Sequence, residues 1–165
     1  MGALAPQGLE FAKLAPFKAD ASIVCRAPAT AVFDVLRDHR RWPEWVGSGV
    51  TEVEPTSDPE FGVGCTRTVR FGRFAYVTER FIGWDEPTLW AFTATSFQPR
   101  FFSKLVERFE IEPIDAHSSR ITYRMGADFP AALRPFGRLI IRFISRGVRP
   151  LLHRLSQEAA KAAVV

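Results

Sequence analysis

Two arginines and one glutamate are the first candidates for a functional site, because they fall on strand-like segments whose other side chains are mostly apolar. Arg67 and Arg80 flank a Gly-Arg turn, and Glu107 is in phase with the apolar residues of a later segment. An unpaired charge in an apolar interior is expensive. The alternatives are an internal ion pair such as Arg80 with Glu107, guanidinium groups that reach the rim, or guanidinium groups that hold the polar end of a ligand.

The turn between the two arginine-bearing segments predicts how they pair. Gly72 followed by Arg73 favours a two-residue type II′ turn, which places Arg67 opposite Thr78. Because side chains alternate along a strand, Arg80 then shares the inner face with Arg67. A shift of one residue in this register would turn both arginines outward and remove the basis for the site.

A larger antiparallel sheet is needed to position these segments. From residue 49 to 129, apolar and polar residues alternate, which is typical of a sheet with one buried and one exposed face. Boundaries set by Gly, Pro and Asp predict strands at 20–27, 49–54, 63–71, 74–84, 88–96, 103–112 and 119–129. Two short helices, one beginning at Pro28 and one near Pro43, are expected between the first and second strands.

The C-terminal quarter of the chain, residues 130–163, predicts a long amphipathic helix. Its apolar arc comprises Leu133, Phe136, Leu139, Ile140, Phe143, Ile144, Gly147 and Leu151. The opposite arc carries Arg134, Arg138, Arg142, Arg146 and Arg149. Because most helical stability comes from packing of the apolar side, the helix is expected to lie on the sheet. The predicted fold class is α+β.

The positive charge of the chain is concentrated on this helix. Residues 130–165 have a net charge of +6 and residues 1–129 a net charge of −2. The arginine arc is either a solvated helix face or a weak contact site for an anionic membrane surface. Nucleic acid is the less favoured partner, since no aromatic residues alternate with these arginines.

Composition points to one domain and to no metal or nucleotide chemistry. Residues 1–19 are expected to form a flexible leader, and residues 20–165 a single ligand-binding domain. The sequence has no nucleotide-binding glycine motif and no nucleophile motif. No stretch of the sequence is apolar enough to span a membrane.

The cysteines and histidines do not form a ligand pattern either. Cys25 and Cys65 are forty residues apart with no clustered histidines, which predicts a reduced, cytoplasmic protein without a zinc site. His39, His117 and His153 are expected on the surface. No metal and no cofactor is predicted.

Several short motifs occur in an order that resembles a known family. They are Ala27, Pro28, Val32 and Phe33; Trp42, Pro43, Glu44 and Trp45; Gly62 and Gly64; Glu79, Arg80 and Phe81; and Arg108, Phe109, Glu110 and Glu112. In this order they resemble the START-like polyketide cyclase/dehydrase and lipid transport superfamily (SRPBCC), whose fold is the helix-grip. The resemblance covers residues 20 to about 160.

The resemblance implies a curved seven-stranded antiparallel sheet wrapped around the long C-terminal helix, with two short helices between strands 1 and 2 and a cavity between sheet and helix. Members carry lipids, sterols, plant hormones or quinones, and some are aromatase/cyclases. In the tetracenomycin type of cyclase a Ser/Thr-x-Arg triplet faces the pocket, and Thr78, Glu79 and Arg80 match it. The chain has Gly49 and Thr93 where those cyclases have a Tyr and an Arg, so cyclase activity is not carried across.

We therefore expect an intracellular binding or carrier protein for a hydrophobic small molecule such as a lipid, a quinone or a polyketide-like compound. The expected ligand-binding residues are Arg67, Val69, Tyr76, Thr78, Arg80, Glu107, Phe109, Tyr123, Met125, Phe136, Ile140, Phe143 and Ile144. The alternative is a polyketide cyclase/aromatase-type enzyme that uses Arg80 in the pocket. The sequence leaves both alternatives open and names no catalytic residue.

Overall fold

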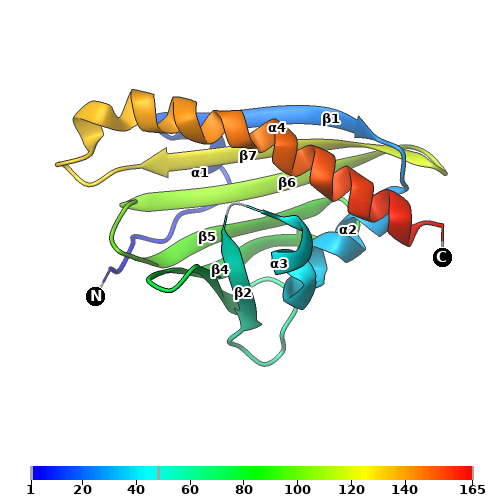
Figure 1. Ribbon diagram of the computed structural model, residues 1–165, viewed down its shortest axis with the longest axis horizontal. Helices are drawn as coiled ribbons and strands as arrows, with labels where there is room; N and C mark the ends of the chain where they lie inside the picture. Colours follow the sequence, from blue (N-terminus) through cyan, green and yellow to red (C-terminus); the bar gives the residue numbers. More distant parts are fainter. Residues whose placement is uncertain (1, 48, 165) are drawn as a thin grey trace.

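An antiparallel sheet and one long helix form the two layers of the protein (Figure 1). The computed structural model describes residues 2–47 and 49–164. The strands are β1 (Phe17–Cys25), β2 (Val50–Pro55), β3 (Thr66–Phe71), β4 (Ala75–Asp85), β5 (Leu89–Gln98), β6 (Lys104–Asp115) and β7 (Ser118–Asp128). The helices are α1 (Phe11–Leu14), α2 (Ala29–Arg37), α3 (Trp42–Trp45) and α4 (Gly137–Ala162), with 3-10 turns η1 (His39–Arg41) and η2 (Arg134–Phe136).

The sheet topology confirms the predicted α+β helix-grip fold. Neighbouring strands are antiparallel in the order β1-β7-β6-β5-β4-β3-β2, so β1 and β2 form the two edges. The two short helices α2 and α3 lie between β1 and β2 in the chain, as predicted. Pro28 directly precedes α2, and Pro43 lies in the first turn of α3. At the start of a helix the backbone N–H that proline lacks would have no partner within the helix.

Helix α4 lies to one side of the sheet rather than over its centre. It contacts β1, β7, α2 and α3, and it continues through Pro150 as one helix. Its buried side chains, Val148, Leu152, Leu155 and Ala159, come from its middle and C-terminal half. The contacts of α4 with the sheet are therefore concentrated on β1 and β7, at one side of the sheet.

The apolar arc predicted for the last helix is wider than the surface that the sheet covers. Phe136, Leu139 and Phe143 are exposed, at 60%, 69% and 74% respectively. In the same part of α4, Ile141 and Ile144 are half-buried against the core. The prediction that the whole arc faces the sheet is therefore wrong for its outer edge.

The register of the β3–β4 hairpin differs from the predicted one by one residue. The connection has three residues, 72–74, instead of two, so Arg67 pairs with Glu79 and not with Thr78. The first residue of this three-residue loop, Gly72, has a positive φ of 58°, a conformation that glycine adopts without steric cost. This register buries Val77 and Phe81 in the core, and it turns the alternate residues of β4 to the outer face. The hydrophobic gain of burying these side chains decides the register over the turn preference.

The N-terminal residues predicted to form a leader pack on the sheet. β5 pairs with β6 only as far as Thr93, and beyond that point the backbone N–H of Leu4 donates to the carbonyl of Thr95 over 2.9 Å. The Leu4 side chain is buried. Farther along, α1 contacts β6 and β7. Residues 2–16 therefore include segments that contact the sheet, and Met1 lies outside the described residues.

Two further observations concern the cysteines and the question of a membrane-spanning helix. Cys25 and Cys65 are both buried free thiols. Within residues 2–47 and 49–164, no helix is long and apolar enough to cross a membrane.

Two glycines, one at a close contact and one in open space, allow a test of this packing. A Cβ at Gly126 would collide with the carbonyl oxygen of Phe11, whereas a Cβ at Gly147 would meet nothing. We expect Gly126→Ala to lower the free energy of unfolding by about 1–3 kcal/mol through overpacking, and Gly147→Ala to raise it by about 0.5–1 kcal/mol through helix propensity. Urea denaturation of the two variants measures both changes. An unchanged Gly126→Ala variant would contradict the docking of α1 on β7.

Candidate functional site

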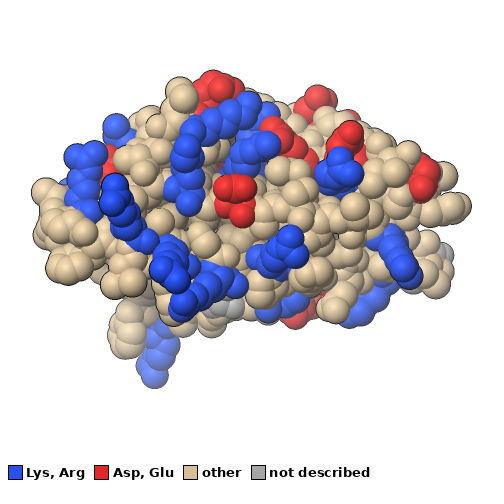
Figure 2. All heavy atoms as spheres, turned by 90° about the horizontal axis from the view of Figure 1, so that it is seen from above, with Lys and Arg blue, Asp and Glu red and all other residues tan. Residues whose placement is uncertain are grey.

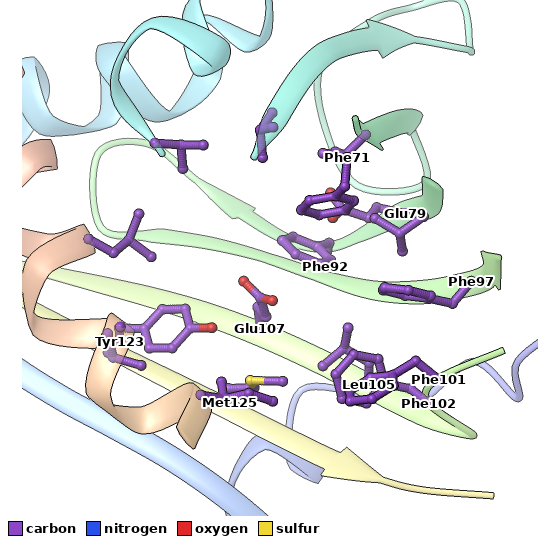
Figure 3. Close-up of a pocket in the computed structure, with 18 of the residues that line it drawn as sticks. Phe71, Glu79, Phe92, Phe97, Phe101, Phe102, Leu105, Glu107, Tyr123 and Met125 are labelled. Carbon is purple, nitrogen blue, oxygen red and sulfur yellow. The ribbon is translucent and has the colours of Figure 1, made fainter. Parts of the chain in front are cut away.

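A cavity of about 420 Å³ lies between α4 and the inner face of the sheet (Figure 3). Its walls are mostly aromatic and aliphatic side chains from β2 to β7, α3 and α4. They are Trp42, Val46, Val50, Val69, Phe71, Val77, Glu79, Phe92, Phe97, Phe101, Phe102, Leu105, Glu107, Phe109, Tyr123, Met125, Phe143, Ile144, Gly147, Val148 and Leu151. The volume falls within the range of about 300–1,000 Å³ typical of small-molecule sites.

Exposed and half-buried members of this wall mark the opening of the cavity. On α4 they are Phe143 and Gly147, and on the opposite side they are Val50 and Phe71. The cavity therefore opens between the N-terminal half of α4 and the β2–β3 edge of the sheet.

The polar groups on the cavity wall are few and lie together. Glu107 on β6 and Tyr123 on β7 bring a carboxyl and a phenol together on this wall, and Figure 3 shows the hydroxyl and the carboxyl pointing toward one another. Both come from neighbouring strands, because Glu107 pairs with Met125 and Phe109 with Tyr123. A ligand in the cavity can thus meet the Glu107 carboxyl and the Tyr123 phenol, with Glu79 as a further carboxyl on a mostly apolar wall.

Behind this wall lies a buried ion pair. The Arg67 Nε donates to Glu79 Oε2 over 2.6 Å, and the Arg67 side chain is fully buried. The guanidinium carbon lies 3.9 Å from the centre of the Trp42 ring and 4.8 Å from that of Trp90, so aromatic faces stabilise the cation. Glu79 touches the cavity, but Arg67 does not line it.

The ion pair leaves a second carboxyl without a cation of its own. Burial, together with the charge of Glu79, raises the pKa of Glu107 to about 7, while the Tyr123 hydroxyl and the charge of Arg67 act in the opposite direction. Glu107 therefore changes protonation near neutral pH. Its protonated form can donate a hydrogen bond to a ligand, and its ionised form can accept one.

His39 was expected on the surface, but it is 2% exposed. Its ring stacks on Phe81 with centroids 5.3 Å apart, beside Trp84 and Trp90. Burial, together with the nearby Arg67, lowers the pKa of His39 to about 3, so the ring is neutral at physiological pH. The short segment around His39 has no hydrophobic periodicity, which is why its burial was not predicted.

The cavity brings together seven of the thirteen residues expected to bind ligand. These are Val69, Glu107, Phe109, Tyr123, Met125, Phe143 and Ile144. Six do not line it. Arg67 lies behind the wall, Tyr76, Thr78 and Arg80 belong to the outward-facing residues of β4, and Phe136 and Ile140 precede the part of α4 that reaches the cavity.

Sequence reasoning also missed residues that do line the cavity. Glu79 would have been found with the correct hairpin register, since it alternates with Val77 and Phe81. The aromatic residues Phe97, Phe101 and Phe102 lie at and beyond the end of β5, where a strand pattern gives no direction for the side chains.

Comparison with known proteins agrees with this architecture. A family model described as polyketide cyclase / dehydrase and lipid transport matches residues 16–160. The chain belongs to this family. Two relatives from Mycobacterium tuberculosis and Mycobacterium bovis, both described as uncharacterized proteins, are 29% identical over 128 residues, which cover 78% of this chain and 75% of each relative.

Solved structures share the fold of this family member. The Zhui aromatase/cyclase from Streptomyces sp. R1128 superposes with a TM-score of 0.69 at 16% identity, covering 86% of this chain and 92% of that chain. A START superfamily protein from Mycobacterium smegmatis superposes with a TM-score of 0.67 at 10% identity, covering 90% of this chain and 97% of that chain. At these identities the likeness establishes the fold, and the ligand has to be inferred from the cavity.

The buried ion pair gives a prediction about stability. Replacing Glu79 by Gln leaves the Arg67 cation buried without its carboxylate, so we expect the free energy of unfolding to fall by about 3–5 kcal/mol. The double variant Arg67→Met/Glu79→Leu removes both charges and should recover most of that loss. The exposed pair of Arg70 with Glu52, at 2.9 Å, is the matched control: Glu52→Gln should cost less than about 1 kcal/mol. Equal losses for Glu79→Gln and Glu52→Gln would contradict the prediction.

The raised pKa of Glu107 predicts a pH dependence of stability. Between its ordinary value of 4.5 and about 7, the folded protein keeps a proton that the unfolded chain has released. The contribution of Glu107 to stability is therefore full below pH 4.5 and is lost as the pH rises to about 7, a change of about 3 kcal/mol.

His39 acts in the opposite direction and has to be separated from Glu107. Its pKa falls from 6.5 to about 3, so the stability that comes from its neutral ring is full above pH 6.5 and is lost as the pH falls toward 3. Glu107→Gln retains the His39 contribution. As the pH rises from 4.5 to 7, we expect the free energy of unfolding of this variant to increase by about 3 kcal/mol relative to that of the parent protein. Urea denaturation at each pH measures this difference. A difference that does not change with pH would refute the assignment.

Proposed function

We propose that the protein is a binding or carrier protein for one hydrophobic small molecule held between the sheet and α4. The observation that carries this proposal is a cavity of about 420 Å³ whose wall is mostly apolar and on which Glu107 and Tyr123 lie together as polar groups. Burial of apolar ligand surface in such a space supplies most of the affinity, and the polar pair fixes the orientation. Membership of a family described by lipid transport supports the same conclusion.

The charges around the cavity favour a ligand whose polar end is uncharged. Among the described residues no Lys or Arg lines the cavity, and Arg67, behind its wall, is engaged by Glu79 and enclosed by aromatic rings. A carboxylate ligand would therefore meet Glu107 without a cation to pair with, at a high electrostatic cost. A hydroxyl or a carbonyl group can exchange hydrogen bonds with Glu107 and Tyr123 at no such cost. This proposal replaces the alternative, considered from the sequence, that guanidinium groups hold the polar end of the ligand.

The alternative function, a cyclase/aromatase-type enzyme, depended on Arg80 lying inside the pocket. Arg80 is exposed on the outer face of β4, and Glu79 takes the inward position. A cation that faces solvent cannot stabilise an enolate inside the cavity. Carriage of a ligand therefore stands ahead of catalysis. Because both cysteines are free thiols, we place this carrier in the cytoplasm.

Binding of two ligands with the same chain length tests the proposal. Displacement of the neutral dye N-phenyl-1-naphthylamine at pH 8 should give an affinity for 1-dodecanol at least about ten-fold higher than for dodecanoate, since the carboxylate is desolvated without a partner. Native mass spectrometry checks that one molecule binds per chain.

Two valines give the matched variants for this experiment. Val69 lines the cavity and Val24 is exposed on β1, so Val69→Phe should weaken binding about ten-fold or more by filling the space, whereas Val24→Phe should not change it. The urea midpoint of each variant verifies folding. Equal binding by both variants, or preference for dodecanoate, would refute the proposed site.

A further inference from the structure

The N-terminal half of α4 carries an exposed apolar strip beside a row of arginines. The strip consists of Phe136, Leu139 and Phe143, of which Phe143 is the most exposed at 74%. At 100° per residue, Arg142 and Arg146 lie next to this strip on the solvent side of the helix. Exposed large apolar side chains beside basic residues are the pattern of a helix that lies on a membrane surface.

The strip continues into a shallow groove that joins the ligand cavity. The groove is lined by Phe101, Leu139, Ile140, Arg142, Phe143 and Arg146. Phe101 and Phe143 also line the cavity. A surface covering the strip would therefore lie directly against one wall of the cavity opening.

Other segments at the same end of the molecule share this character. The strand pairing places the loops at 72–74 and 99–103 and the turn before α4 at one end of the sheet. Phe74, at the tip of the β3–β4 loop, is 85% exposed. Arg73 and Arg100 are exposed as well. Apolar tips and cations thus occur together at this end.

The arginines of α4 have no acidic partner that would neutralise them. Among the described residues, Arg134 pairs with Asp128, whereas Arg138, Arg142, Arg146 and Arg149 form no ion pair. Seen from above, Figure 2 shows basic side chains gathered toward the side on which α4 begins in Figure 1. This surface therefore carries four arginines that have no ion-pair partner among the described residues.

We propose that the exposed apolar strip and the arginines Arg138, Arg142, Arg146 and Arg149 dock the protein on an anionic lipid bilayer, with α4 parallel to the membrane plane. Apolar side chains would enter the acyl boundary while the guanidinium groups bind lipid phosphates. A second copy of the chain is a poorer occupant, because a symmetric interface would bring two rows of arginines together. The charge pattern therefore selects the lipid surface.

Docking at this surface would place the cavity opening next to the bilayer, so that an apolar ligand could move between them with little exposure to water. The transfer of a ligand between bilayer and cavity rests on the proposed function, whereas the docking surface itself does not. Flotation of protein without ligand therefore tests the surface separately from ligand binding.

The experiment is flotation with vesicles of phosphatidylcholine alone and with vesicles containing phosphatidylglycerol, at low and high salt. We expect association with the anionic vesicles only, and loss of it at high salt because surface charges are screened. Arg142→Gln/Arg146→Gln should lower the partition coefficient by about 30-fold, from the contribution of each basic residue near an anionic membrane. Phe136→Ser/Leu139→Ser should lower it as well.

Matched controls remove the same chemistry elsewhere on the surface. Arg26→Gln/Arg80→Gln takes away two exposed arginines outside the docking surface, and Val63→Ser/Ile114→Ser takes away two exposed apolar side chains at the opposite end of the sheet. Both controls should float like the parent protein. Equal flotation on neutral and anionic vesicles, equal losses in the controls, or self-association through Phe136 and Leu139 without vesicle binding would overturn the proposal.

Discussion

The ion pair between Arg67 and Glu79 is the constraint on which the site depends. A charge buried as deeply as Arg67 has to be paired, and the paired arrangement fixes adjacent structure. It requires β3 and β4 to align with Arg67 opposite Glu79. It also draws Trp42 of α3 onto the guanidinium, 3.9 Å from the ring centre, which ties the connection between β1 and β2 to the sheet. The ion pair thus joins register, helix placement and the electrostatics of the cavity.

The position of α4 explains why a cavity exists beside such a well-packed core. The helix is held by β1 and α2 through Val148, Leu152 and Leu155, so it cannot move toward the centre of the sheet without exposing these side chains. Interiors are otherwise close-packed, and a void forfeits dispersion contacts. The aromatic rings of Phe97, Phe102 and Phe129 pack on one another with centroids 5.3 to 5.5 Å apart. This cluster supports the part of the cavity wall formed by Phe97 and Phe102. Rigid walls on both sides keep the space from collapsing.

The sequence was sufficient for the architecture and insufficient for the direction of particular side chains. The change of period from two to 3.6 and the turn residues located all seven strands and the long helix. The hairpin register was wrong because Gly72 is compatible with loops of two or three residues, and burial of Val77 and Phe81 decides between them. His39 was misplaced for a related reason: its burial depends on aromatic side chains such as Phe81 and Trp90, which are distant in the sequence.

The positive charge of the chain and the chemistry of its cavity are separate properties. The cations of α4 lie outside the cavity, where water screens them and an anionic surface can reach them. Inside, no described Lys or Arg lines the cavity, Arg67 behind its wall is matched by Glu79, and Glu107 adds negative charge as it ionises. An anionic ligand attracted by the net charge of +4 would therefore be repelled at the polar end of the cavity. The two proposals therefore assign different chemistry to the two regions, a negatively charged surface outside and an uncharged molecule within.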